Sequence, residues 1–160
     1  MTNKIVSDVM TGNLITAKPE MPLKEAIKIL AKQHISGLPV VNEKGKLIGI
    51  VSETDLMWQA SGVTPPLYIM LLDSVIFLEN PARYEKEVHK ALGETVKDVM
   101  TKNPITTAPD QSLSVAAKLM HERSIHRLPV VNENDEVIGI LTSGDIIRAI
   151  ATELEKESGE

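Results

Sequence analysis

The chain repeats itself. A shift of 90 residues aligns residues 6–58 with residues 96–148 without a gap, and 23 of these 53 positions are identical. The identities fall in blocks, which are Asp8–Thr11 with Asp98–Thr101, Leu38–Glu43 with Leu128–Glu133, and Ile48–Ile50 with Ile138–Ile140. A unit of about 55 residues buries only about 60% of its surface and is marginal alone. The duplication therefore predicts two copies that pack face to face with pseudo-two-fold symmetry.

Both copies show the same order of expected elements: strand, helix, strand, strand, helix. In copy one we expect a strand at 14–17, a helix over 22–33 that starts at Pro22, a hairpin of 38–41 and 47–51, and a helix that opens at Ser52. Copy two repeats this order, with a helix capped by Ser112, a hairpin of 128–131 and 137–141, and a helix that opens at Thr142. Because a helix joins the first strand to the second, these two strands should pair in parallel. The predicted fold class is α/β (α+β), with two βαββα repeats.

Four regions follow from this pattern: residues 1–60 (copy one), 61–94, 95–152 (copy two) and an acidic tail at 153–160. The region 61–94 matches neither copy. It starts with a turn-rich stretch, and Pro66 and Pro81 are placed to begin helices over 67–78 and 82–92. We therefore expect a helical inter-repeat segment whose apolar stretch packs on the copies or on a partner.

Composition excludes several classes of protein. The 160 residues carry a net charge of −5, no cysteine, one Trp, two Tyr and one Phe. Without cysteine there is no disulfide, zinc–thiolate site or cysteine nucleophile. An acidic chain with so few rings lacks both the basic surface and the stacking platforms of a nucleic-acid binder. The N-terminus has no signal core and the apolar stretch 67–78 is too short for a bilayer, so we expect a cytoplasmic protein without nucleic-acid or membrane partners.

Motifs for catalysis and metal binding are missing from the sequence. There is no nucleophile elbow, phosphate-binding glycine run or paired-histidine motif. The four histidines, His34, His89, His121 and His126, lie in no cluster with metal-ligand spacing. We therefore predict that the chain is not an enzyme, holds no metal and requires no cofactor.

The tetrapeptide Thr142-Ser143-Gly144-Asp145, repeated in copy one as Ser52-Glu53-Thr54-Asp55, is the strongest candidate for a binding site. It lies where a strand ends and a helix begins, and free N–H groups and the helix dipole favour an anion there. A hydroxyl can donate to a phosphate, and a carboxylate three residues later can accept from ribose hydroxyls. The alternative is a helix cap, because the pattern is close to a capping box. The two roles do not exclude each other.

Taken together, the duplicated motifs resemble a tandem CBS-domain pair, also called a Bateman module. The matching elements are Asp-Val-Met-Thr, Leu-Pro-Val-Val-Asn, Ile-Gly-Ile and Ser/Thr-x-x-Asp, which occur twice in the same order and spacing over roughly residues 4–60 and 94–150. The chain looks like a stand-alone CBS protein. The resemblance implies a sensor or regulator that binds an adenosine-containing ligand in clefts between the copies. AMP, ADP or ATP is expected before S-adenosylmethionine or cyclic di-AMP. It also implies a homodimer and a regulated partner protein.

The resemblance also implies which residues contact the ligand. It assigns phosphate and ribose contacts to Thr142 and Asp145, and to Ser52 and Asp55 in copy one. The adenine is expected against segments that contain Ile15, Thr16, Ala17, Leu38 and Pro39 in copy one, and Ile105, Thr106, Thr107, Leu128 and Pro129 in copy two. The leucines and isoleucines are equally interpreted as core, and the prolines as edge-strand residues whose neighbouring backbone faces the base.

The two copies differ at the expected phosphate position. Copy two has His126 and Arg127 before Leu-Pro-Val-Val, where copy one has Ser36 and Gly37. A guanidinium suits a phosphate, although a solvated surface charge is the alternative. With Ser143 replaced by Glu53 in copy one, we predict unequal sites, of which the copy-two site binds more tightly.

Two other functions remain open at this stage. One is a ligand-independent interaction or scaffold protein whose working surface is the 61–94 segment. The other is a minor enzyme that acts on nucleotides.

Overall fold

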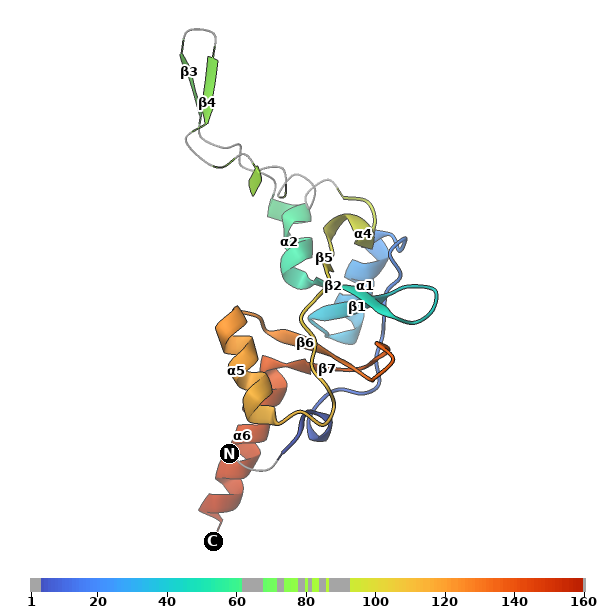
Figure 1. Cartoon of the computed structure of the whole chain (residues 1–160), viewed down its shortest axis with the longest axis vertical. Coiled ribbons are helices and arrows are strands. Elements are labelled where there is room, and N and C mark those ends of the chain that lie inside the picture. The colour runs from blue at the N-terminus through green and yellow to red at the C-terminus, as the bar shows by residue number, and fades with distance from the viewer. Residues whose placement is uncertain are drawn as a thin grey trace. The chain divides into compact units, whose positions relative to one another are not determined.

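The computed structural model describes residues 4–61, 68–71, 74–77, 80, 82, 83, 86 and 93–159 (Figure 1). The chain separates into two compact units. Unit 1 comprises residues 1–16, 39–50 and 101–160, and unit 2 comprises residues 17–38 and 51–100. Each unit therefore combines segments of both copies. The predicted mixture of helices with small sheets in each repeat is confirmed.

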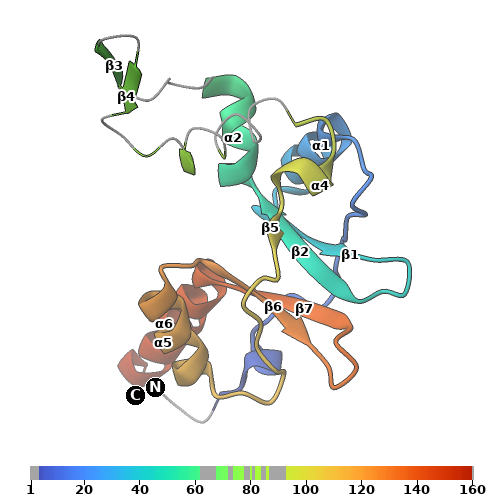
Figure 2. The same cartoon turned by 45° about the horizontal axis from the view of Figure 1, so that its top comes forward.

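Unit 1 is centred on the elements of copy two. The antiparallel strands β6 (Arg127–Val131) and β7 (Val137–Thr142) lie beside the helices α5 (Leu113–Arg123) and α6 (Ser143–Ser158) (Figure 2). One buried cluster joins all four elements: Leu113, Ala116, Met120, Leu128, Val130, Leu141, Ile146 and Ala149. The predicted parallel pairing of the first and second strands is present as a single bridge between Thr107 and Val130. In copy one, the strand expected at 14–17 does not form, and within this range Ala17 forms a single β-bridge.

We call the residues of each copy that precede its first expected strand the lead-in. The lead-in of copy one contributes to this core of copy two. It contains the 3-10 helix η1 (Val6–Asp8), and Val6 is fully buried in the cluster. Its backbone N–H donates to the carbonyl of Gln111 at 2.9 Å, and Thr11 exchanges two backbone hydrogen bonds of 3.0 Å with Ile140. The side chain of Met10 packs over Gly139, where an added Cβ would lie 2.3 Å from the Met10 Sδ and would displace that side chain. Met10 is partly buried and packs against the cluster.

In unit 2, the lead-in of copy two packs against elements of copy one. It contains α1 (Leu23–Gln33), α2 (Glu53–Ser61) and the short α4 (Val96–Val99) from the lead-in of copy two. The N–H of Val96 donates to the carbonyl of Met21 at 2.9 Å, and that of Leu23 donates to Glu94 at 3.0 Å. The spacing of Leu23, Ala26, Ile27 and Leu30 predicts one apolar face of α1, of which Leu23, Ala26 and Leu30 are buried and Ile27 is 40% exposed. Each lead-in therefore belongs structurally to the other copy.

A three-stranded sheet has the order β1 (Gly37–Val41), β2 (Leu47–Ser52), β5 (Thr101–Lys102), and its β1–β2 hairpin is the predicted one. The two hairpins have the same turn chemistry. Asn42 Oδ1 accepts from the N–H groups of Lys44 and Lys46 at 2.9 and 3.0 Å. Asn132 Oδ1 accepts from the N–H groups two and four residues later at the same distances. The side chain of Asn thus closes both turns.

Three predictions about local structure are wrong. Residues 68–71 and 74–77 form the antiparallel strands β3 (Tyr68–Leu71) and β4 (Ser74–Phe77), not a helix over 67–78. Short apolar runs do not distinguish helix from strand by periodicity, and the β-branched and aromatic residues here favour a strand. Pro22 is the N-cap residue of α1 rather than its first residue. Ser112 is the N-cap of α5, but its hydroxyl bonds Ser114 and caps no N–H.

Of the second expected helix, over 82–92, residues 82, 83 and 86 are helical and the others lie outside the described residues. Within the described chain, no helix combines the length and the apolar character needed to cross a membrane.

Candidate functional site

The N-terminus of α6 carries the central group of predicted residues. Thr142 is the N-cap, and its hydroxyl accepts from the N–H of Asp145 at 3.2 Å. The Asp145 carboxylate returns this contact, because its Oδ2 accepts from Thr142 N at 2.7 Å and from Thr142 Oγ1 at 2.8 Å. The predicted capping role is therefore present in the ligand-free chain. Asp145 is only 7% exposed, so its carboxylate is held in a defined position.

Strand register brings Arg127 to the same place. Arg127 lies directly opposite Thr142 in the β6–β7 ladder, and its side chain is half-buried. Residues opposite each other in an antiparallel pair project from the same face of the sheet. Arg127 thus lies next to the Thr142–Asp145 pair in the structure, whereas the sequence relates Arg127 to this pair only by resemblance.

Arg148 joins this group and was missed at the sequence level. Its Nη2 pairs with Asp145 Oδ1, while its side chain is 73% exposed. Its Nη1 passes beside Gly144, where an added Cβ would lie 3.4 Å from Nη1 and 3.6 Å from Thr142 Oγ1. The available signal was the spacing, because residues i and i+3 are neighbours on a helix. The absence of a side chain at Gly144 leaves space between a cation and a hydroxyl.

Copy one has the cap without these cations. The Ser52 N–H donates to Asp55 Oδ2 at 2.9 Å, and Ser52 Oγ donates to the same oxygen at 3.1 Å. Asp55 is 6% exposed, as its equivalent is in copy two. The positions of the two arginines are occupied by Gly37 and Trp58. The contact of the buried carboxylate with the residue that precedes the helix is therefore common to both copies, whereas the two arginines belong to copy two.

Ser143 and His126 form a second group of predicted site residues. The His126 Nδ1 and Ser143 Oγ are 3.3 Å apart, and Ser143 N donates to the His126 carbonyl at 3.0 Å. Both line a cavity of about 520 Å³ whose other walls come from α5 and α6: Ala117, Met120, His121, Ser124, Ile125, Ile146 and Ile147. Neither Thr142 nor Asp145 lines this cavity.

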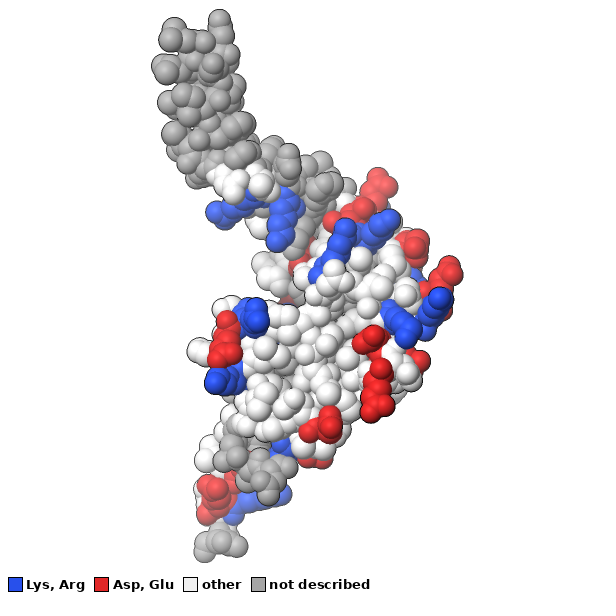
Figure 3. Space-filling view, in the orientation of Figure 1, with Lys and Arg blue, Asp and Glu red and all other residues white. Residues whose placement is uncertain are grey.

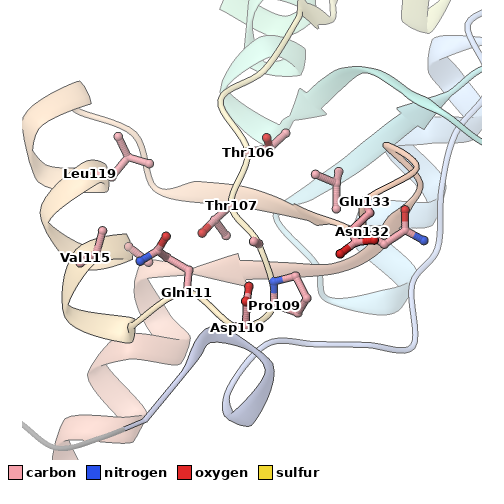
Figure 4. Close-up of a pocket in the computed structure, with 12 residues that line it drawn as sticks. Thr106, Thr107, Pro109, Asp110, Gln111, Val115, Leu119, Asn132 and Glu133 are labelled. Atoms are coloured by element: carbon pink, nitrogen blue, oxygen red, sulfur yellow. The ribbon is translucent and has the colours of Figure 1, made fainter.

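Thr106 and Thr107 form a third group of predicted site residues. They line a separate cavity of about 580 Å³ between the loop before α5, helix α5 and the tip of the β6–β7 hairpin (Figure 4). Arg127, Thr142 and Asp145 do not line it. In copy one, Thr16 is half-buried and Ala17 is 1% exposed.

The strand residues predicted to face the adenine are interior. Leu38 and Leu128 are fully buried, and so are Pro39 and Pro129. Gly37 is buried as well. The carbonyl of Pro129 accepts from Thr107 N at 3.0 Å. Ile15 and Ile105, at 36% and 37% exposed, are the more accessible apolar residues of these segments.

The described residues contain no group of three or more His, Asp or Glu side chains arranged to hold a metal ion. On the face drawn in Figure 3, basic and acidic side chains both occur, and the described residues form no continuous basic band. The chemistry available at α6 is therefore that of anion and hydroxyl recognition.

Comparison with known proteins gives independent information. The family model described as "CBS domain" matches residues 6–61 and 96–152. The uncharacterized protein MJ1426 of Methanocaldococcus jannaschii is 34% identical over 91% of this chain and 90% of its own length. The chloroplastic CBS domain-containing protein CBSX2 of Arabidopsis thaliana is 32% identical over 96% of this chain, which spans 66% of that protein.

Two solved structures are similar over most of both chains. CBSX2 in complex with AMP has a TM-score of 0.76 at 32% identity, and covers 92% of this chain and 97% of its own. The CBS domain pair of protein MJ0100, in complex with 5′-methylthioadenosine and S-adenosyl-L-methionine, has a TM-score of 0.71 at 29% identity and covers 95% and 99%.

Proposed function

The chain belongs to the CBS domain family as a tandem pair, and from this premise we propose that it is a non-catalytic regulatory module that binds an adenosine-containing ligand. The observation that carries the proposal is the group formed by Arg127, Thr142, Asp145 and Arg148 at the start of α6. The AMP bound to CBSX2 and the two adenosine derivatives bound to MJ0100 support the ligand class.

Charge favours a phosphorylated ligand. Arg148 holds its guanidinium at Asp145, and Arg127 lies opposite Thr142 in the strand ladder, so two cationic residues flank a helix N-terminus where the dipole also attracts an anion. S-adenosylmethionine carries a positive sulfonium that these groups would repel. We therefore propose AMP, ADP or ATP, with the phosphate near Thr142 and Gly144.

The ribose is proposed to contact Asp145. Its Oδ2 is already occupied by the cap, while Oδ1 pairs with Arg148, whose long side chain is exposed and can move. A carboxylate oxygen has two lone pairs and can accept from a ribose hydroxyl in addition to, or in place of, a guanidinium. Ligand binding would thus exchange the partner of Arg148 from Asp145 to the phosphate.

Regulation requires that the ligand bind two states of the protein with different affinity. We propose that these states differ in assembly, as a homodimer or with a regulated partner protein.

The test is a thermal-shift and calorimetric panel on nucleotide-stripped protein with AMP, ADP, ATP, adenosine, S-adenosylmethionine, cyclic di-AMP and GMP. A ligand at about 100 times its dissociation constant adds about 2.7 kcal/mol to stability, which raises the Tm by several degrees. Selective stabilisation by adenine nucleotides supports the proposal. No stabilisation by any of them, in protein shown to be folded and empty, contradicts it and favours an interaction protein.

The Asp145→Ala and Asp55→Ala variants form a matched pair for this panel. Both remove a buried capping carboxylate, so their stability losses should be similar. Nucleotide binding should be abolished by the first and reduced less by the second. Circular dichroism of both variants establishes that they remain folded.

A further inference from the structure

The start of α2 in copy one keeps the carboxylate that the proposed function assigns to a ribose. Asp55 is 6% exposed, and its Oδ2 accepts from Ser52 N at 2.9 Å and from Ser52 Oγ at 3.1 Å. Asp145 is 7% exposed and accepts from the same two groups of Thr142. The part of the site that recognises a nucleoside is therefore present in both copies.

The proposed phosphate position differs between the copies in the space available. In copy two, Gly144 leaves room beside Thr142 Oγ1, since a Cβ added to this glycine would lie 3.6 Å from that atom. The aligned residue of copy one is Thr54, and its Oγ1 lies within hydrogen-bond distance of Ser52 Oγ, at 3.0 Å. A phosphate at the Ser52 hydroxyl would have to displace the Thr54 side chain, whereas copy two has no side chain to displace there.

Glu53 changes the charge at the same point. It directly follows Ser52 and is exposed, whereas the aligned residue of copy two is the neutral Ser143. The helix dipole favours an anion at this end of α2, but a carboxylate in the first turn offsets it. Like charges close together at a hydrated protein surface repel each other by enough to lower affinity about tenfold.

The two cations of copy two have no counterparts in copy one. Arg127 aligns with Gly37, which is buried, and Arg148 aligns with Trp58, which is half-buried. Trp58 and Asp55 are neighbours on α2, because residues i and i+3 lie on the same side of a helix. An indole ring does not attract a phosphate, but its face attracts a cation.

From these differences, and resting on the proposed function, we infer that the copy-one site selects an adenosine derivative without a phosphate. Asp55 holds its ribose, and its 5′ group is neutral or positively charged. Glu53 and Thr54 determine this selectivity, the first through charge and the second through space. The two copies thus take different ligands, a nucleotide in copy two and a nucleoside in copy one.

Calorimetry on the Asp145→Ala variant isolates copy one, because this change removes the ribose contact of copy two. Adenosine, AMP and 5′-amino-5′-deoxyadenosine share one nucleoside and carry a neutral, an anionic and a cationic 5′ group. The variant should bind adenosine about tenfold more tightly than AMP, and the amine at least as tightly as adenosine. Equal affinity for AMP and adenosine, or no binding of either, would overturn the inference.

Residues exchanged between the copies identify the cause. In the Asp145→Ala background, Glu53→Ser together with Thr54→Gly should raise the affinity for AMP relative to adenosine about tenfold. Glu25→Ser is the control, since it removes an exposed carboxylate in the first turn of α1, and it should leave this ratio unchanged. An equal response to the exchange and to the control would contradict selection by Glu53 and Thr54.

The reverse exchange, Gly144→Thr in the otherwise unchanged chain, should lower AMP affinity about tenfold and leave adenosine affinity within a factor of about two. The added Cβ would lie 3.4 Å from Arg148 Nη1, at the exposed end of a side chain that can shift, so folding is retained. Unchanged AMP affinity in this variant contradicts only the inference. An unmodified chain that binds neither AMP nor adenosine contradicts the proposed function itself.

Discussion

The two copies of this chain differ little in their cores and much at the N-termini of their last helices. Leu38 and Leu128 are both fully buried, and Asp55 and Asp145 are both buried capping carboxylates. The residues around the caps have diverged: Arg127 and Arg148 in copy two correspond to Gly37 and Trp58 in copy one. The buried carboxylate is therefore kept in both copies, whereas the two arginines occur in copy two.

The largest expected effect tests whether the cores are equivalent. Leu128→Ala and Leu38→Ala should each lower the free energy of unfolding by about 2–5 kcal/mol, because each leaves a cavity in a packed core. Urea unfolding measures this loss. Ile147→Ala, at a side chain 64% exposed, is the control and should change it by less than about 0.5 kcal/mol. A small loss for one leucine alone would break the equivalence of the cores.

The second prediction tests the difference in charge. Arg127→Gln should weaken AMP binding by about 1.5–3 kcal/mol, or roughly tenfold to a hundredfold, because it removes a charge-assisted contact to the phosphate. Calorimetry measures this change. Arg123→Gln removes the same charge at an exposed position in the last turn of α5 and should leave the affinity within a factor of two or so of the wild type. Equal weakening by both would mean that only overall charge matters.

The third prediction concerns the hydroxyls that precede the last helix of each copy. Thr142→Ala should lower the ligand-free unfolding free energy by about 1 kcal/mol, the usual value for a lost N-cap hydroxyl, whereas Ser52→Ala should lower it less, because Ser52 Oγ donates to Asp55 Oδ2 and, among the described residues, accepts from no helix N–H. Thermal unfolding of both variants without nucleotide gives this comparison. If Thr142→Ala has no effect on stability, its hydroxyl is not retained for capping.

The smallest expected effect isolates Arg148. Arg148→Gln should weaken AMP binding about threefold, as expected for an exposed cation, and leave adenosine binding unchanged, since adenosine has no phosphate. The ratio of the two dissociation constants is the measurement. A parallel loss of AMP and adenosine affinity would instead make Arg148 a positioning residue for Asp145.

Much of the fold could be predicted from the sequence, because the pattern of each element in the repeat occurs in both copies. The helices at α1 and α5, both hairpins and the caps at Thr142 and Ser52 follow from local periodicity, turn residues and capping patterns. The region between the copies occurs once in the chain, so no duplicate sequence supports the assignment of its helices and strands. Its apolar run at 67–78 was therefore assigned to the wrong element, although β-branched and aromatic residues favoured the strands that formed.

The candidate site was only partly available. The Thr142–Asp145 pair was evident from its spacing, and the importance of Arg127 came from resemblance. Arg148 was overlooked because an arginine on an exposed helix face usually lies in solvent; its pairing with Asp145 is visible only when the helix is built.

By itself, the sequence determined two repeats that each contain a helix, a hairpin and a second helix, the buried carboxylate at the start of each last helix, and the different residues of the two copies around it, because these are properties of adjacent residues. Only the tertiary structure decided that each lead-in completes the other copy. Val6 of copy one is buried with Leu128 and its N–H donates to the Gln111 carbonyl, and both of these residues belong to copy two. The two lead-ins have nearly the same sequence, so periodicity cannot say which core each will enter. Long-range burial decides it, because Val6 and Val96 are each fully buried beside elements of the other copy.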